Sequence, residues 1–331
     1  MSLKFLSISE AKTLIQNTSY FSQMSDGEIR ARLQIAGVAN YNQSNKNKSK
    51  SNNENLTLIK QLYLNSVSEY TPSEKTVMVQ YFSMVMSLLK GKAPLLFPNT
   101  QICACKLSGA RKLDWNFPYT LNNCIVLPQQ FVDLCVAQAK DLQQSLSQKS
   151  NTVWNLYRPQ LAGMLQPATT IAHEILHIVQ RYPTPQQSDL MSGIYSEWKF
   201  KRLHPKNIKY HTTDARDFLP VTNPDGVNYT WAVGIWYHNK VNWFAPLLIL
   251  PDIEYNPTGV LLPLTIEYNG SLTAGNFMTI ESNGKYLEMF AELDINSLYH
   301  PNEIFATAVS EWLIQDKVYN KLNDDGFYKL F

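Results

Sequence analysis

The sequence is poor in cysteine and in charge. Only 4 cysteines occur among 331 residues, which is too few for a disulfide scaffold, so we expect all of them to be reduced thiols. Charged residues make up 17% of the chain, and 29 basic residues nearly balance 27 acidic ones. This balance provides no overall attraction to nucleic acid or to an anionic membrane. The composition therefore predicts neither nucleic acid nor a membrane as a partner.

The sequence also lacks long hydrophobic runs. The apolar run over 244–250 is interrupted by Pro246 and is far shorter than the roughly 20 residues that a membrane-spanning helix requires. Residues 1–10 do not form the sustained apolar stretch and cleavage site of a secretory signal. We therefore expect a cytoplasmic protein. Because 44% of its residues are hydrophobic, the chain can form one large core or two ordinary ones.

Composition and hydrophobic spacing divide the chain into four segments. Residues 1–41 show helical spacing, and residues 42–55 are almost wholly Asn, Ser, Lys and Gln, which predicts a flexible loop. Residues 56–182 are expected to contain helices and a small sheet. Residues 183–331 are expected to be rich in strands and to end in a helix that begins near Pro301. We expect the segments to form one compact unit.

Two helices are marked by local signals. The sequence Thr-Pro-Ser-Glu over 71–74 forms a capping box with proline in the first turn, and this helix should extend to about Leu89. Within residues 151–182, Pro167 should separate two helical pieces, because proline cannot donate the backbone hydrogen bond that a helix interior needs.

Strand signals appear in both halves of the chain. The compact apolar run 124–127 predicts a strand that Pro128 ends, and a helix over about 129–147 should follow. In the strand-rich second half, the sequences over 238–240 and 283–284 are typical of hairpin turns. We expect these turns to connect neighbouring antiparallel strands.

The sequence His-Glu-Ile-Leu-His over 173–177 carries the clearest chemical signal. On a helix, His173 and His177 lie one turn apart on the same face, so both imidazoles can bind one zinc ion. Glu174 then lies beside the open coordination position, where it can act as a general base. The alternative is a pair of core histidines that bind no metal. The apolar residues around the motif predict a buried helix under either interpretation.

A catalytic zinc site requires a third protein ligand that leaves the fourth position for water. The remaining histidines do not have the short spacing of a three-histidine motif, which favours either Glu303 or Glu197. We favour Glu303, because it lies in the first turn of the predicted last helix, whereas basic residues follow Glu197. Thr307, one turn after Glu303, could hydrogen-bond a ligand histidine. Arg181, at the end of the motif helix, is expected to cap that helix.

These motifs resemble those of the gluzincin branch of zinc metallopeptidases. In that branch a glutamate on a second helix completes the site, commonly in the pattern Glu-x-x-Ala-Asp/Glu, and here the pattern is Glu303-Ile-Phe-Ala-Thr307. Thr307 stands where the family usually has an acid. The chain is also similar to uncharacterised peptidase-like proteins of large DNA viruses. The similarity lies in three motifs and their order, namely His-Glu-x-x-His-Ile-Val-Gln-Arg, Asn-Pro-Asp over 223–225, and His-Pro-Asn-Glu-Ile. This second resemblance implies a viral protein, in the cytoplasm or in the virion.

The resemblance implies an α+β fold of the zincin-like metallopeptidase type. This fold would have a helical N-terminal part, a small sheet with an edge strand, an active-site helix, and a β-rich insertion before the last helix. It also implies a zinc-dependent endopeptidase that acts on a peptide or protein substrate, with Zn²⁺ bound by His173, His177 and Glu303. The strand over 124–127 would be the edge to which an extended substrate is added.

Two further residues are candidates for the catalytic step. Tyr299 and His300 precede Glu303 by four and three residues, so either could be carried to the edge of the metal site and donate a hydrogen bond to the oxyanion that forms during amide hydrolysis. Two alternative functions remain open. One is a non-catalytic structural or binding protein that retains the zincin-like fold and could be associated with a virion. The other is a hydrolase of amide bonds other than peptide bonds.

Overall fold

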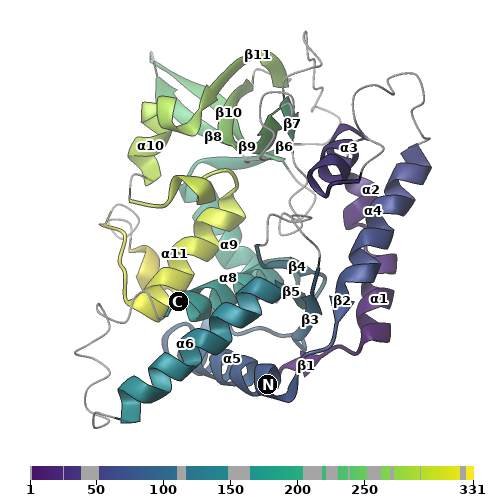
Figure 1. Ribbon diagram of the computed structural model, residues 1–331. Coiled ribbons are helices and arrows are strands. Elements are labelled where there is room, and N and C mark those ends of the chain that lie inside the picture. The colour runs from purple at the N-terminus through teal and green to yellow at the C-terminus, as the bar shows by residue number, and fades with distance from the viewer. Residues whose placement is uncertain are drawn as a thin grey trace.

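The computed structural model describes residues 2–24, 26–38, 52–109, 117–147, 165–203, 218–220, 230–237, 239–251, 262–268, 272–290, 292–320 and 326–331. These residues form an α+β structure with two separate sheets (Figure 1), as the sequence predicted at the level of fold class. No helix in the described ranges is both long enough and apolar enough to cross a membrane.

The elements of the first half are β1 (Lys4–Phe5), α1 (Ile8–Asn17), α2 (Tyr20–Gln23), α3 (Asp26–Ile35), α4 (Asn52–Ser66), β2 (Val67–Ser68), α5 (Pro72–Lys92), η3 (Pro94–Leu96), β3 (Cys103–Leu107), β4 (Tyr119–Leu121), β5 (Cys124–Pro128) and α6 (Gln129–Ser147). Those of the second half are α8 (Gln166–Arg181), α9 (Pro185–Glu197), β6 (Phe200–Leu203), β7 (Phe218–Pro220), β8 (Thr230–Tyr237), β9 (Lys240–Pro251), β10 (Leu262–Tyr268), β11 (Leu272–Thr279), η6 (Ile280–Ser282), α10 (Gly284–Phe290), η7 (Ile295–Ser297), α11 (Pro301–Gln315) and η8 (Phe327–Leu330).

The first sheet has the strand order β1-β3-β5-β4, and β2 also pairs with β3. Strands β1, β3 and β5 are parallel, and β4 is antiparallel to β5. Because successive side chains of a strand point to opposite faces, this sheet contributes to two cores. Ala104 and Ile125 pack in the main core with α5, α6 and α8, while Cys105 and Val126 pack against α1–α4. The sheet therefore lies between two helical layers (Figure 1).

The second sheet is antiparallel and has the order β11-β10-β9-β8-β6, with β7 paired to β9. Asn239, at φ 60°, lies in the turn between β8 and β9. One face of this sheet, including Phe200, Val233 and Phe244, packs into the same main core as α8 and α11. The main core thus runs from the first sheet, through α8 and α11, to the second sheet.

Several local predictions are confirmed. Thr71 caps α5 in a capping box with Glu74, β5 ends at Pro128, and α6 covers the residues expected to be helical. The helix that carries the histidine motif begins at Gln166, with Pro167 in its first turn. All 4 cysteines are buried free thiols. The predicted helical piece over 151–164 and the Asn-Pro-Asp sequence lie outside the described residues.

Other predictions are wrong. The predicted loop over 42–55 is too long, since α4 already begins at Asn52, while residues 42–51 lie outside the described ranges. The sequence over 283–284 is no hairpin turn. Asn283 instead accepts a hydrogen bond from the Tyr286 backbone N–H through its side chain, which caps the start of α10. An Asn side chain can stabilise a hairpin turn or cap a helix. The residues that follow it determine which of the two structures forms.

Strand β1 and helix α9 are among the elements that were not predicted. Strand β1 is only two residues long and gains its stability from pairing with β3, so no local pattern reveals it. Helix α9 interrupts the segment that was expected to be rich in strands. Its signal was present, because Thr184, Pro185 and Gln187 form the same type of capping box as the start of α5.

Candidate metal centre

Helices α8 and α11 pack against one another in the main core and carry the candidate centre (Figure 1). Helix α8 buries Ile171, Ile175 and Ile178, while its motif histidines face α11. Helix α11 begins at Pro301, and its His300 N-cap accepts a hydrogen bond from the backbone N–H of Asn302 at 3.1 Å. A capped, buried helix start holds the next residue, Glu303, on a rigid element.

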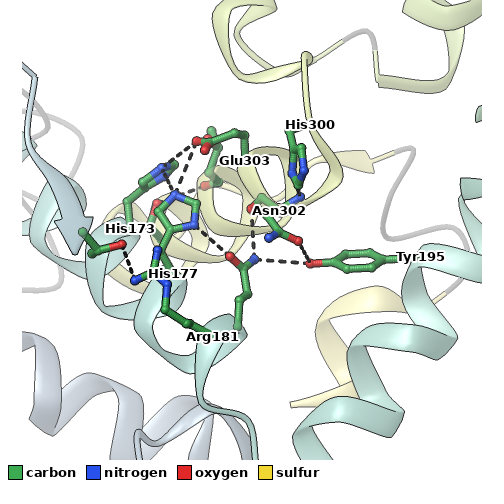
Figure 2. Close-up of polar contacts among 11 residues, drawn as sticks. His173, His177, Arg181, Tyr195, His300, Asn302 and Glu303 are labelled. Atoms are coloured by element: carbon green, nitrogen blue, oxygen red, sulfur yellow. Dashed lines mark hydrogen bonds and ion pairs between the residues drawn. The ribbon is translucent and has the colours of Figure 1, made fainter. Parts of the chain in front are cut away.

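Three potential ligand atoms converge between these helices (Figure 2). The Nε2 atoms of His173 and His177 are 2.9 Å apart. Oε2 of Glu303 lies 3.1 Å from Nε2 of His173 and 3.4 Å from Nε2 of His177. Among the described residues, this is the one group of His, Cys, Asp and Glu with the spacing of a metal site. The structure therefore brings together the three residues that the sequence predicted as ligands.

The donor set fits a zinc ion in chemistry and in spacing. Zinc in proteins is bound by imidazole nitrogen and carboxylate oxygen at about 2.0–2.1 Å in a tetrahedron, which places neighbouring ligand atoms about 3.3 Å apart. The three separations of 2.9, 3.1 and 3.4 Å lie close to that value. Two histidines and one carboxylate also leave the fourth position open, as in catalytic zinc sites.

Glu197, the competing ligand, does not belong to this group. It is the last residue of α9, its side chain is exposed, and the described metal-ligand cluster does not include it. Glu303 is nearly buried instead. The structure thus places Glu303, and not Glu197, beside the two histidines.

The electrostatics of the cluster favour an anionic Glu303. Burial by itself raises the pKa of this carboxyl group, but the imidazole of His177, and then that of His173, outweigh burial and hold the pKa of Glu303 well below its usual value. The ionised form is the one that binds a cation. The His173 side chain remains 21% exposed, whereas His177 is fully buried, so solvent reaches the cluster at His173.

A buried network of hydrogen bonds lies beside the three ligand residues (Figure 2). Nδ1 of His177 is 2.8 Å from Oε1 of Gln180, whose Nε2 donates to the Asn302 carbonyl oxygen at 3.0 Å and to the Tyr195 hydroxyl at 3.3 Å. The Tyr195 hydroxyl in turn donates to Oδ1 of Asn302 at 2.9 Å. Sequence reasoning missed Gln180, Tyr195 and Asn302. The spacing of three residues between His177 and Gln180 was the available signal, because such residues share a helix face.

The predicted catalytic residues occupy different environments. Glu174 lies in α8 beside His173 and is only 3% exposed. Tyr299 is half-buried and packs against the main core. The His300 ring is buried and is engaged through Nδ1 in capping α11, so Nε2 is its remaining ring nitrogen. These contacts do not join Tyr299 or His300 to the three clustered ligand atoms.

Arg181 lies in the last turn of α8, as predicted, and it also bonds to the first sheet. Its Nη1 donates to the Thr120 hydroxyl at 2.9 Å and to the Asn122 carbonyl oxygen at 2.6 Å. Arg181 therefore connects the end of the histidine helix to β4 and the following turn. The partner of His177 at Nδ1 is Gln180 and not Thr307.

The prediction that residues 124–127 form the sheet edge is wrong. These residues belong to β5, which pairs with β3 on one side and with β4 on the other. Within the described residues β4 pairs with β5 alone, so β4 is the edge strand on this side of the sheet, and β1 and β2 lie on the other side, next to β3. A short antiparallel strand that returns beside β5 cannot be recognised from the β5 sequence, since strand position in a sheet is a tertiary property.

Comparisons with protein-family models, with curated proteins and with solved structures give no significant match to this chain.

Proposed function

We propose that this protein is a zinc-dependent endopeptidase with a zincin-like fold, in which His173, His177 and Glu303 bind Zn²⁺. The observation that carries the proposal is the convergence of their three ligand atoms, with Glu303 contributed from a helix 130 positions after His173. The resemblance to gluzincins supports the same assignment. A peptide or protein is the proposed substrate, in the cytoplasm or in a viral context.

The metal and Glu174 would divide the chemistry between them. When bound, zinc would supply Lewis-acid chemistry, since it polarises a carbonyl group and lowers the pKa of coordinated water toward about 7. The Glu174 carboxylate would take the proton of the attacking water and pass it to the nitrogen of the leaving amine. A purely structural metal site has no use for such a base, which favours the catalytic alternative.

The proposed oxyanion donor is Tyr299 or His300. Because Nδ1 of His300 accepts the Asn302 N–H, the proton of a neutral His300 ring lies on Nε2, and only this atom could donate to an oxyanion. Tyr299 offers its hydroxyl group. A Tyr299→Phe variant with unchanged turnover would remove Tyr299 as the donor, and the equivalent result with His300→Gln would remove His300.

The proposed substrate site is the outer edge of β4, whose three residues are buried, so an added peptide would have to displace the groups that cover them. An extended peptide can add to a sheet edge through backbone hydrogen bonds that do not depend on its side chains. Strand β4 contacts the histidine helix directly, and Arg181 fixes the two elements to one another. A peptide bound along β4 would therefore lie next to the helix that carries the ligands.

The deciding experiment is elemental analysis of the purified wild-type protein beside Glu303→Ala and Glu197→Ala, paired with cleavage of a mixed peptide library. We expect one zinc per chain in the wild type and in Glu197→Ala, and none in Glu303→Ala. We also expect Glu174→Gln to retain zinc and to lose cleavage. A folded protein that contains no zinc, or zinc without any cleavage, would favour the non-catalytic structural or binding protein, and cleavage confined to non-peptide amides would favour the other hydrolase.

A further inference from the structure

The orientation of the Gln180 side chain is fixed by a group that can only accept hydrogen bonds. That group is the backbone carbonyl oxygen of Asn302, which lies 3.0 Å from Nε2 of Gln180. A carbonyl oxygen has no proton to give, so the amide nitrogen must face it. The amide oxygen, Oε1, must then face Nδ1 of His177 at 2.8 Å.

An amide oxygen is likewise only an acceptor, so the proton between it and His177 lies on Nδ1 of the imidazole. Nε2 is then the ring position at which a metal ion, or a second proton, binds. This is the atom that lies beside Glu303 and His173. We infer that Gln180 is a positioning residue, which fixes the His177 tautomer and ring orientation so that Nε2 points at the zinc site. The inference rests on the proposed zinc function.

The same amide also contacts the second helix. Its Nε2 bonds the carbonyl group of Asn302, and Asn302 directly precedes Glu303. The Tyr195 hydroxyl closes the network through the Asn302 side chain. Gln180 is only 9% exposed, so water cannot readily replace its hydrogen bonds. One side chain thus contacts both helices that carry the ligands.

The chemistry of glutamine suits this position. The carbonyl half of its amide is the acceptor for His177, and the nitrogen half is the donor for Asn302. A glutamate keeps the acceptor and loses the donor, while a methionine of similar length loses both. Outer partners of ligand histidines commonly contribute 10–100-fold in metal affinity. Substitutions of Gln180 can therefore separate two effects: loss of the hydrogen bond to His177, and loss of the contact to Asn302.

The test is the zinc dissociation constant, measured by competition with a chromophoric chelator, for wild type, Gln180→Met, Gln180→Glu and Tyr195→Phe. We expect Gln180→Met to weaken zinc binding about 10–100-fold and Gln180→Glu to restore it to within about threefold, because the acceptor returns. Tyr195→Phe is the matched control, since it breaks the same buried network without touching His177. It should lower the melting temperature and leave zinc affinity nearly unchanged.

A second measurement uses the wild-type protein alone and does not depend on whether a variant folds. In protein labelled with ¹⁵N in histidine, NMR reports which ring nitrogen of His177 is protonated, and we expect Nδ1 in both the metal-free and the zinc-loaded protein. A proton on Nε2 and metal on Nδ1 would overturn the inference. So would wild-type affinity in a folded Gln180→Met, or an equal loss in Tyr195→Phe. If the wild type binds no zinc, the proposed function fails instead, and the spectrum of the metal-free protein still decides the role of Gln180.

Discussion

Oε2 of Glu303 lies 3.1 Å from Nε2 of His173, although the two residues are 130 positions apart in the chain. Helices α8 and α11 must pack against one another before these atoms can meet. Since α8 and α11 pack in the main core together with residues of both sheets, the cluster is complete only when that core is complete. Metal binding and the stability of the whole fold are therefore expected to be linked.

The first prediction concerns metal removal. A ligand that binds only the native state at 100 times its dissociation constant stabilises the protein by about 2.7 kcal/mol. Added zinc should raise the melting temperature accordingly, and a chelator should reverse the increase. Calorimetry of Glu303→Gln should show no increase with zinc, whereas Glu197→Gln, which changes an exposed glutamate, should behave like the wild type. Equal responses of the two variants would contradict the ligand assignment.

The second prediction concerns Glu174. Substitution by glutamine keeps the size of this buried side chain and removes its ability to accept a proton. We expect kcat for peptide cleavage to fall about 10²–10⁴-fold, the usual contribution of a general base. Zinc content and melting temperature should remain close to those of the wild type. Retained turnover in a zinc-loaded Glu174→Gln protein would exclude Glu174 as the base.

The third prediction concerns the edge strand. Arg181 makes two hydrogen bonds to the β4 side of the sheet, and a lysine cannot reproduce the planar fork of its guanidinium group. Arg181→Lys should therefore loosen β4 relative to α8 and raise KM for peptides about tenfold, equivalent to about 1.4 kcal/mol, with little change in zinc affinity. Arg202→Lys, at an exposed position of β6, is the matched control. An unchanged KM in Arg181→Lys would argue against substrate binding along β4.

The fourth prediction concerns acid stability. Burial raises the pKa of the Glu74 carboxyl group, but hydrogen bonds from Lys106, Gln129 and the Thr71 backbone outweigh this and lower the pKa to about 2, from 4.5. A carboxyl group with a lowered pKa stabilises the folded state above the unfolded pKa, and this contribution is lost as the pH falls from about 4.5 to about 2. The stability of the wild type should decline over this range.

Glu74→Gln should reduce that decline and should itself lower the free energy of unfolding by about 3 kcal/mol at neutral pH, because it leaves the buried Lys106 ammonium without its counter-charge. The matched control is Glu10→Gln, since the Lys4–Glu10 pair is exposed and exposed pairs contribute about 0–1 kcal/mol. Urea unfolding between pH 2.5 and 7 measures both. Equal costs for the two variants would show that the Glu74 pair does not stabilise the core.

Short-range patterns were sufficient for much of the secondary structure. The capping box at Thr71 defined the start of α5, and the histidine motif with Pro167 defined α8. These signals involve residues within one or two helical turns, so the sequence itself contains both partners. Where a signal allowed two outcomes, as at Asn283, the local pattern was not decisive.

The sequence by itself determined the two histidines, the neighbouring Glu174 and their shared helix face, because helical spacing requires no other part of the chain. Only the tertiary structure brought Glu303 rather than Glu197 to the two histidines, placed β4 rather than β5 at a sheet edge, and joined Gln180 to Asn302. Each of these depends on atoms brought together by core packing and strand pairing across long stretches of chain. Hydrophobic burial drives that packing without regard to sequence distance, so the identity of such partners appears only when the core has formed.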